Sequence, residues 1–85
     1  MKVSDLGIIA ALRLSGIKEK SVDSSDIKRI AFIFDDIAQV VEIVDKFQDG
    51  SIVGPLKGYY DAVKSVKNYI YFIKDKYENP RHIYR

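Results

Sequence analysis

The sequence predicts one small α+β domain: a helix, a two-stranded β-hairpin and two further helices, the last of them long. A chain of 85 residues has room for one hydrophobic core. On folding, a domain of this size buries little more than ~60% of the surface that its unfolded chain exposes to water. Hydrophobic residues at 47% and charged residues at 31% are typical of a globular protein. Apolar residues follow helical spacing, then strand alternation, then helical spacing again. We therefore expect a domain over residues 1–79 and a basic C-terminal tail over residues 80–85.

The first helix is predicted over residues 5–15. Ser4 precedes it and is a good N-cap residue, and Gly16 can end it in the left-handed conformation that glycine adopts at low cost. Nearly every residue between them is apolar, and Arg13 is the one charge past the first turn. This helix should lie largely buried.

Two strands of a hairpin are predicted over residues 17–22 and 27–34. The residues between them are turn formers, and Asp23 and Asp26 flank serines there. The second strand has the clearer alternation, which directs three large residues to one face: Ile30, Phe32 and Phe34. We expect that face to lie on the core.

The second helix is predicted to begin near Asp36 and to end at Gly50. Asp36 with Gln39 three residues later resembles a capping box, and Gly50 is a stop signal. The apolar positions between them recur at spacings of three and four, but most are β-branched and lower the intrinsic helix propensity. This helix should depend on tertiary contacts.

The third helix is predicted from Pro55 to Glu78. Proline suits a first helical turn, because its missing N–H has no partner there in any case. At 1.5 Å per residue the helix is roughly 36 Å long, about the diameter of the domain. Its inward face is expected to contain Leu56, Tyr59, Val63, Val66, Ile70, Ile73 and Tyr77. The predicted core comprises Leu12, Phe32, Phe34, Val44, Phe47, Val63, Val66 and Ile70.

Several pieces of this sequence carry a likeness to a known family. They are Asp5-Leu6 leading to Gly16, the run Ile30-Ala31-Phe32-Ile33-Phe34-Asp35-Asp36, the residues Phe47, Gly50 and Val53, and Tyr60, Ala62, Lys64 and Lys67 of the last helix. In this order they resemble a family of short, uncharacterised bacterial, archaeal and phage-borne domains classified as a domain of unknown function. The resemblance implies the order of elements and no functional residue.

Catalytic and metal-binding patterns are weak throughout. The single histidine, His82, follows Asn79-Pro80 near the end of the sequence, where no partner or pocket is evident. Asp35-Asp36 would suit a magnesium ion or acid–base chemistry, but a strand end followed by a helix cap accounts for them more simply. There is no cysteine, and the glycines do not have phosphate-loop spacing. We expect no enzyme, no metal site and no cofactor.

A stripe of lysine and tyrosine runs along the third helix beside its apolar face. At 100° per residue its members fall within about a 100° sector: Lys57, Tyr60, Lys64, Lys67, Tyr71 and Lys74. Ammonium groups neutralise phosphates and aromatic rings stack on bases, so this Lys/Tyr stripe predicts contact with nucleic acid, with Arg81 extending it. The alternative, that the lysine stems simply cover the apolar face, remains open.

The C-terminal half of the same helix is apolar around most of its circumference. A small core cannot cover every side, and an exposed apolar patch usually marks an interface. The predicted interface contains Tyr69, Ile70, Phe72, Ile73 and Tyr77. We expect a homodimer joined by an isologous contact there. The alternatives are a docking site for another protein, or singly exposed rings with no partner.

Charge and hydropathy limit the kinds of partner and cellular location that can be expected. The formal net charge of +2 neither requires nor excludes a polyanionic partner. The first residues lack the pattern of a signal peptide, and no apolar run approaches the ~20 residues that span a bilayer. We expect a cytoplasmic protein that does not enter a membrane. The leading function is a small non-enzymatic binding module, a homodimer that contacts nucleic acid.

Overall fold

The computed structural model describes residues 1–78, and the side chains of residues 1–76. Within that part the order is β1 (Lys2–Val3), α1 (Leu6–Leu14), β2 (Ser21–Asp23), β3 (Ala31–Ile33), α2 (Ala38–Asp49) and α3 (Leu56–Glu78). The α+β class and the long last helix are confirmed. The predicted tail at residues 80–85 lies outside the described residues.

The small antiparallel sheet has the strand order β1-β3-β2. The expected hairpin is β2 with β3, but both strands are shorter than predicted, and Asp23 lies in β2 instead of the turn. Strand β1 adds a third strand on the other side of β3, with Val3 paired to Phe32. The N-terminus is fixed as well: the Met1 ammonium donates to the Phe34 carbonyl at 2.7 Å, and the Phe34 N–H donates to the Met1 carbonyl at 2.8 Å. The sequence did not indicate β1, because a strand of two residues is too short to show alternation.

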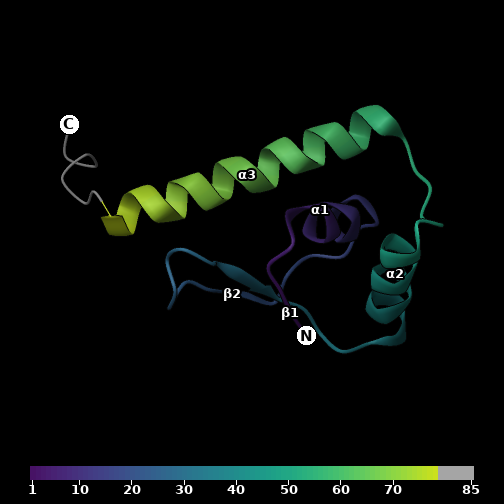
Figure 1. The fold of residues 1–85 in the computed structure, drawn as a ribbon, viewed down its shortest axis with the longest axis horizontal. Helices are drawn as coiled ribbons and strands as arrows, with labels where there is room; N and C mark the ends of the chain where they lie inside the picture. Colours follow the sequence, from purple (N-terminus) through teal and green to yellow (C-terminus); the bar gives the residue numbers. More distant parts are fainter. Residues whose placement is uncertain (79–85) are drawn as a thin grey trace.

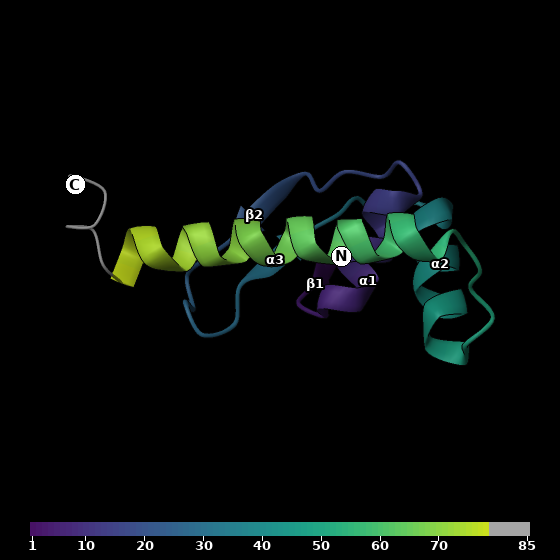
Figure 2. The same cartoon turned by 90° about the horizontal axis from the view of Figure 1, so that it is seen from above.

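Helix α3 runs along the molecule above α1 and the sheet, and α2 packs at one end (Figure 1). Turning the molecule shows α3 crossing over α1 and passing above the sheet (Figure 2). The principal dimensions are 44 × 27 × 18 Å. At 1.5 Å per residue, the 23 residues of α3 extend for about 35 Å of the longest dimension. The helix is therefore too long for one small core to cover on all sides.

The core lies between the sheet, α1, the start of α2 and the inner face of α3. Its largest fully buried side chains are Phe32, Phe34, Ile9, Leu12, Val40 and Val66. Helix α1 is buried from Ile8 to Leu12, as its composition predicts. Of the other predicted core residues, Val44, Phe47 and Ile70 are only partly buried at its margin, and Val63 is half-buried. Leu56 is 87% exposed, so its predicted inward position is wrong, because α3 begins beyond the edge of the core.

The ends of the helices correct two predicted caps. Asp5, not Ser4, caps α1, and its Oδ1 accepts the Ile8 N–H at 3.1 Å. The capping box at Asp36 is absent: α2 has Ile37 at its N-cap without a side-chain bond, and the Asp36 carboxylate lies 3.1 Å from the N-terminal ammonium. Strand β1 brings that ammonium to the end of β3, where the Asp36 carboxylate pairs with it and caps no helix.

Both predicted glycine stops are confirmed. Gly16 and Gly50 follow α1 and α2 with φ values of 85° and 81°. Residues with a Cβ adopt this left-handed region only at a cost, so glycine ends each helix cleanly.

Candidate nucleic-acid interface

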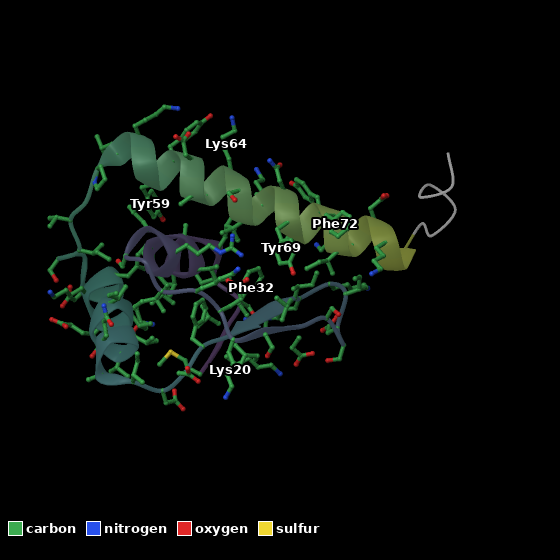
Figure 3. All side chains as sticks on the ribbon, turned by 180° about the vertical axis from the view of Figure 1, so that it is seen from behind. Lys20, Phe32, Tyr59, Lys64, Tyr69 and Phe72 are labelled. Atoms are coloured by element: carbon green, nitrogen blue, oxygen red, sulfur yellow. The ribbon has the colours of Figure 1, made fainter. Side chains whose placement is uncertain are left out.

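The structure places most of the Lys/Tyr stripe on the surface of α3. Lys57, Tyr60, Lys64, Lys67 and Tyr71 are exposed, whereas Lys74 is half-buried. Lys64 points away from the domain, while Tyr59 on the inner face points toward α1 (Figure 3). The stripe therefore presents cationic and aromatic groups to the solvent along most of its length, and it turns toward the domain at Lys74.

The N-terminal end of the stripe is occupied by its own contacts. The ammonium groups of Lys57 and Lys64 lie 5.7 and 5.4 Å from the centroid of the Tyr60 ring. Lys57 Nζ also lies 3.0 Å from Asp61 Oδ1. Such exposed cation–π and ion-pair contacts are weak, on the order of 0.5–1 kcal/mol each. They nevertheless offset the charge of Lys57 and cover the face of Tyr60.

The middle of the stripe is less engaged. Among the described side chains, the ion pairs include neither Lys64 nor Lys67. Tyr71 follows them with 56% of its surface exposed. Lys67 and Tyr71 are therefore the groups most available to an external ligand, and Lys64 follows them, because its ammonium also contacts the Tyr60 ring.

Lys74 lies near two cationic residues, Lys28 and Arg29, that the sequence analysis did not identify as part of a site. It borders a hollow of about 490 Å³ together with Lys28 and Arg29, which precede β3. These two residues are separated from Lys74 by more than forty positions in the sequence. In the sequence these cations are visible only as a Lys-Arg pair near the start of the predicted second strand. The packing of α3 brings Lys74 to the same hollow as this pair.

The predicted interface residues divide between the core and the surface. Tyr69 packs edge-on against Phe32, with ring centroids 5.9 Å apart and an interplanar angle of 83°. Ile73 is buried and Ile70 is partly buried. Phe72 is the most exposed of the four, with 63% of its surface accessible, and Tyr69 keeps 38% of its surface exposed despite its contact with Phe32. The side chain of Tyr77, and Arg81 of the predicted nucleic-acid set, lie outside the described residues.

Arg13 supports the packing of Tyr69. Its guanidinium carbon lies 5.7 Å from the Phe32 ring centroid and 5.8 Å from that of Tyr69. Its Nε and NH2 groups donate to the two carboxylate oxygens of Glu19 at 3.2 and 2.9 Å. This two-point ion pair fixes the guanidinium beside the rings and holds Tyr69 on the domain side of α3.

A second surface, at the opposite end of α3, was missed by the sequence analysis. It is an apolar groove of about 530 Å³ whose lining includes Leu14, Phe47, Ile52, Val53 and Leu56. Val53 is 92% exposed at its rim. The consecutive apolar pair Ile52-Val53 in the connector before α3 was the available signal.

The described part of the chain shows no arrangement suited to metal binding. It contains no cluster of three or more His, Cys, Asp or Glu side chains that could hold a metal, and no buried polar or charged side chain. Asp35 lies 3.4 Å from Lys20 Nζ, and Asp36 pairs with the N-terminus, both near the surface. His82 lies outside the described residues. None of the helices within residues 1–78 has the length and hydropathy to cross a membrane.

The fold and this surface define a small α+β domain whose long last helix carries a cationic and aromatic outer face. The chain belongs to the family described as Domain of unknown function (DUF5659), whose sequence model matches residues 1–72. The match extends from β1 to Phe72, so the likeness to an uncharacterised domain family is confirmed. Neither a curated protein nor a solved structure matches the chain.

Proposed function

We propose that this chain is a small, non-enzymatic, cytoplasmic binding module that contacts nucleic acid through the outer face of α3. The observation that supports it most is the exposure of Lys64, Lys67 and Tyr71 on the side of the helix away from the core. Lysines that release counterions from phosphates provide affinity, and an accessible ring can stack on a base of any sequence. A stripe of this kind favours binding without strong sequence preference.

Asp61 and Asp75 are exposed on α3 near the stripe, and both carboxylates oppose this function. Asp61 would repel a phosphate, but its Oδ1 is 3.0 Å from Lys57 Nζ, so the two charges largely offset each other. Lys57 should consequently add little to binding, and Lys64 and Lys67 should add most.

Equilibrium binding to labelled mixed-sequence DNA and RNA tests the proposal. Fluorescence anisotropy between roughly 50 and 200 mM salt should show affinity that falls as salt rises, by about 0.7 in the log–log slope per phosphate contact on a single strand. Replacing Lys64 and Lys67 together by alanine should therefore lower the affinity and reduce the slope by about 1.4. Both lysines are exposed, so the fold should be retained.

The control is the double change Lys18→Ala with Lys46→Ala, which removes the same formal charge from exposed sites off α3; Lys46 Nζ lies 3.2 Å from Glu42 Oε1 there. It should leave the slope unchanged. Undetectable binding by the unmodified chain at low salt, or an unchanged slope after the Lys64 and Lys67 substitutions, would refute the proposed function.

The second part of the proposal is a homodimer joined at Phe72. An isologous contact places the same exposed ring of each copy against the other, so one residue supplies both halves of an apolar contact. Phe72 is five residues from Lys67, which places it about 140° around the helix from that lysine. A dimer centred on Phe72 thus leaves Lys67 accessible, and both parts of the proposal are compatible.

A further inference from the structure

A cationic hollow lies between the C-terminal half of α3 and the segment that leads into β3. Lys74 contributes from the helix, Lys28 and Arg29 contribute from the segment, and Ile30 and Ile70 supply the apolar part of the lining. The connection between β2 and β3 approaches this half of α3 in both ribbon views (Figures 1 and 2). Two distant segments therefore bring three cations to one depression of about 490 Å³.

The charges of this hollow are not balanced within the described residues. No carboxylate of the described side chains lies within ion-pair distance of Lys28, Arg29 or Lys74. Asp5 is the one carboxylate in the lining, and its Oδ1 already accepts the Ile8 N–H at the start of α1. Three cations and one carboxylate leave a net charge of +2 around the hollow, which attracts an anion.

Lys28 and Arg29 belong to a turn that is held by hydrogen bonds to Asp26. Asp26 Oδ1 accepts the Lys28 N–H at 3.0 Å, and the Asp26 carbonyl accepts the Arg29 N–H at 3.0 Å. Arg29 also borders a neighbouring hollow lined by Asp23 and Asp26, and neither carboxylate lies within ion-pair distance of its guanidinium. The backbone positions of Lys28 and Arg29 are thus set before any ligand arrives, which lowers the entropic cost of binding.

We infer that this hollow is a subsite for one backbone phosphate of a single-stranded nucleic acid, an inference that rests on the proposed function. The guanidinium of Arg29 presents paired donors that match two phosphate oxygens, and the lysines add charge. Tyr71 is three residues before Lys74, about 4.5 Å along the helix axis. A base stacked on Tyr71 thus places an adjoining phosphate within reach of the hollow, and the strand continues along α3 past Lys67.

The test uses the full chain and fluorescein-labelled oligothymidine of about 20 nucleotides, longer than the site size of a small binding domain. The principal variant is Lys28→Gln with Arg29→Gln, and Lys74→Gln is tested separately. Each should weaken binding about tenfold at low salt and reduce the log–log salt slope by about 0.7, the contribution of one phosphate. The control is Lys18→Gln with Lys46→Gln, which should leave the slope as it is.

The possible outcomes separate this subsite from the proposed function. If the unmodified chain binds and the hollow variants match the control, the subsite is refuted and the function of the α3 stripe stands. If the unmodified chain does not bind, both are refuted. Circular dichroism checks the fold, and if the double variant does not fold, the slope of the single variant Lys28→Gln, at an exposed site off α3, decides the question.

Discussion

Asp23 shows how single charged residues hold this small sheet together. Its Oδ2 lies 2.8 Å from Lys2 Nζ, so a side chain of β2 joins one of β1 across the central strand. Its Oδ1 also accepts the Ser25 N–H at 3.0 Å and the Ser25 hydroxyl at 2.7 Å. The bond from Lys2, followed by those from Ser25, lowers the pKa of the Asp23 carboxyl well below its usual range.

This lowered pKa predicts a specific loss of stability in acid. A carboxyl whose pKa is lower in the folded state adds stability above its unfolded pKa, near ~3.9. That contribution is lost as the pH falls toward the folded pKa. We expect the free energy of unfolding, measured with urea at neutral pH and below pH ~4, to fall less steeply with acid in Asp23→Asn than in the unmodified chain.

Asp49 provides the comparison for that experiment. Hydrogen bonds from Ser51 lower the pKa of the Asp49 carboxyl. Asp49 should therefore contribute to the loss of stability in acid in both proteins, so the free energy of unfolding of Asp23→Asn should still fall to some extent as the pH is lowered. Identical pH dependence in the two proteins would show that the contacts of Asp23 do not stabilise the fold.

At the scale of the elements, Gly7 is where the three helices meet. A Cβ at this position of α1 would lie 2.7 Å from Phe47 Cζ of α2 and 3.0 Å from the Tyr59 hydroxyl of α3. That hydroxyl donates to the Gly7 carbonyl at 3.3 Å. Glycine costs a helix about 0.5–1 kcal/mol relative to alanine. Close packing of α2 and α3 on α1 explains its presence.

Gly7→Ala should therefore destabilise the protein despite its better helix propensity. Overpacking costs about 1–3 kcal/mol, which exceeds the propensity gain, so the net loss in the free energy of unfolding should be about 1 kcal/mol. Denaturant titration measures it.

The matched partner is Phe47→Leu, which removes the Cζ atom that a Cβ at position 7 would meet. The cost of Gly7→Ala should be smaller in that background, giving a measurable coupling in a double-mutant cycle. A stabilised Gly7→Ala chain would mean that the helices do not pack closely at this position.

At the scale of the whole molecule, the length of α3 leaves surfaces that one domain does not cover. Tyr59, Val66 and Ile73 lie on its inner side, while Phe72 and Leu56 remain 63% and 87% exposed. The two exposed residues lie toward opposite ends of the same helix. An assembly can cover one end without covering the other.

Light scattering at high micromolar concentration should give the mass of a dimer. Phe72→Lys should convert it to a monomer, because a charge at the centre of an apolar contact would have to be desolvated without a partner. Leu56→Lys is the matched control and should stay dimeric. A monomeric mass for the unmodified chain would refute the homodimer, and dissociation by Leu56→Lys alone would refute the contact at Phe72.

The features that could be predicted from the sequence are those that depend on local chemistry. Gly16 and Gly50 end helices through their own backbone freedom, and the alternation of Ile30, Phe32 and Phe34 follows from strand geometry. The almost entirely apolar composition of α1 likewise predicted that this helix is buried. Such features depend on neighbouring residues alone, so the order of elements, the α+β class and much of the core could be predicted.

Only the tertiary structure decided which groups from distant segments share a surface. Helical periodicity groups residues into faces, but the rotation of α3 is set by its packing, which directs Tyr69 to Phe32 and Ile73 into the core while Phe72 stays outside. The same packing brings Lys74 to Lys28 and Arg29. The sequence by itself determined the three helices, the hairpin of β2 with β3 and most of their apolar faces, because these depend on local geometry. The cationic hollow, the third strand and the pairing of Asp36 with the N-terminus required the folded chain, because their partners meet only there.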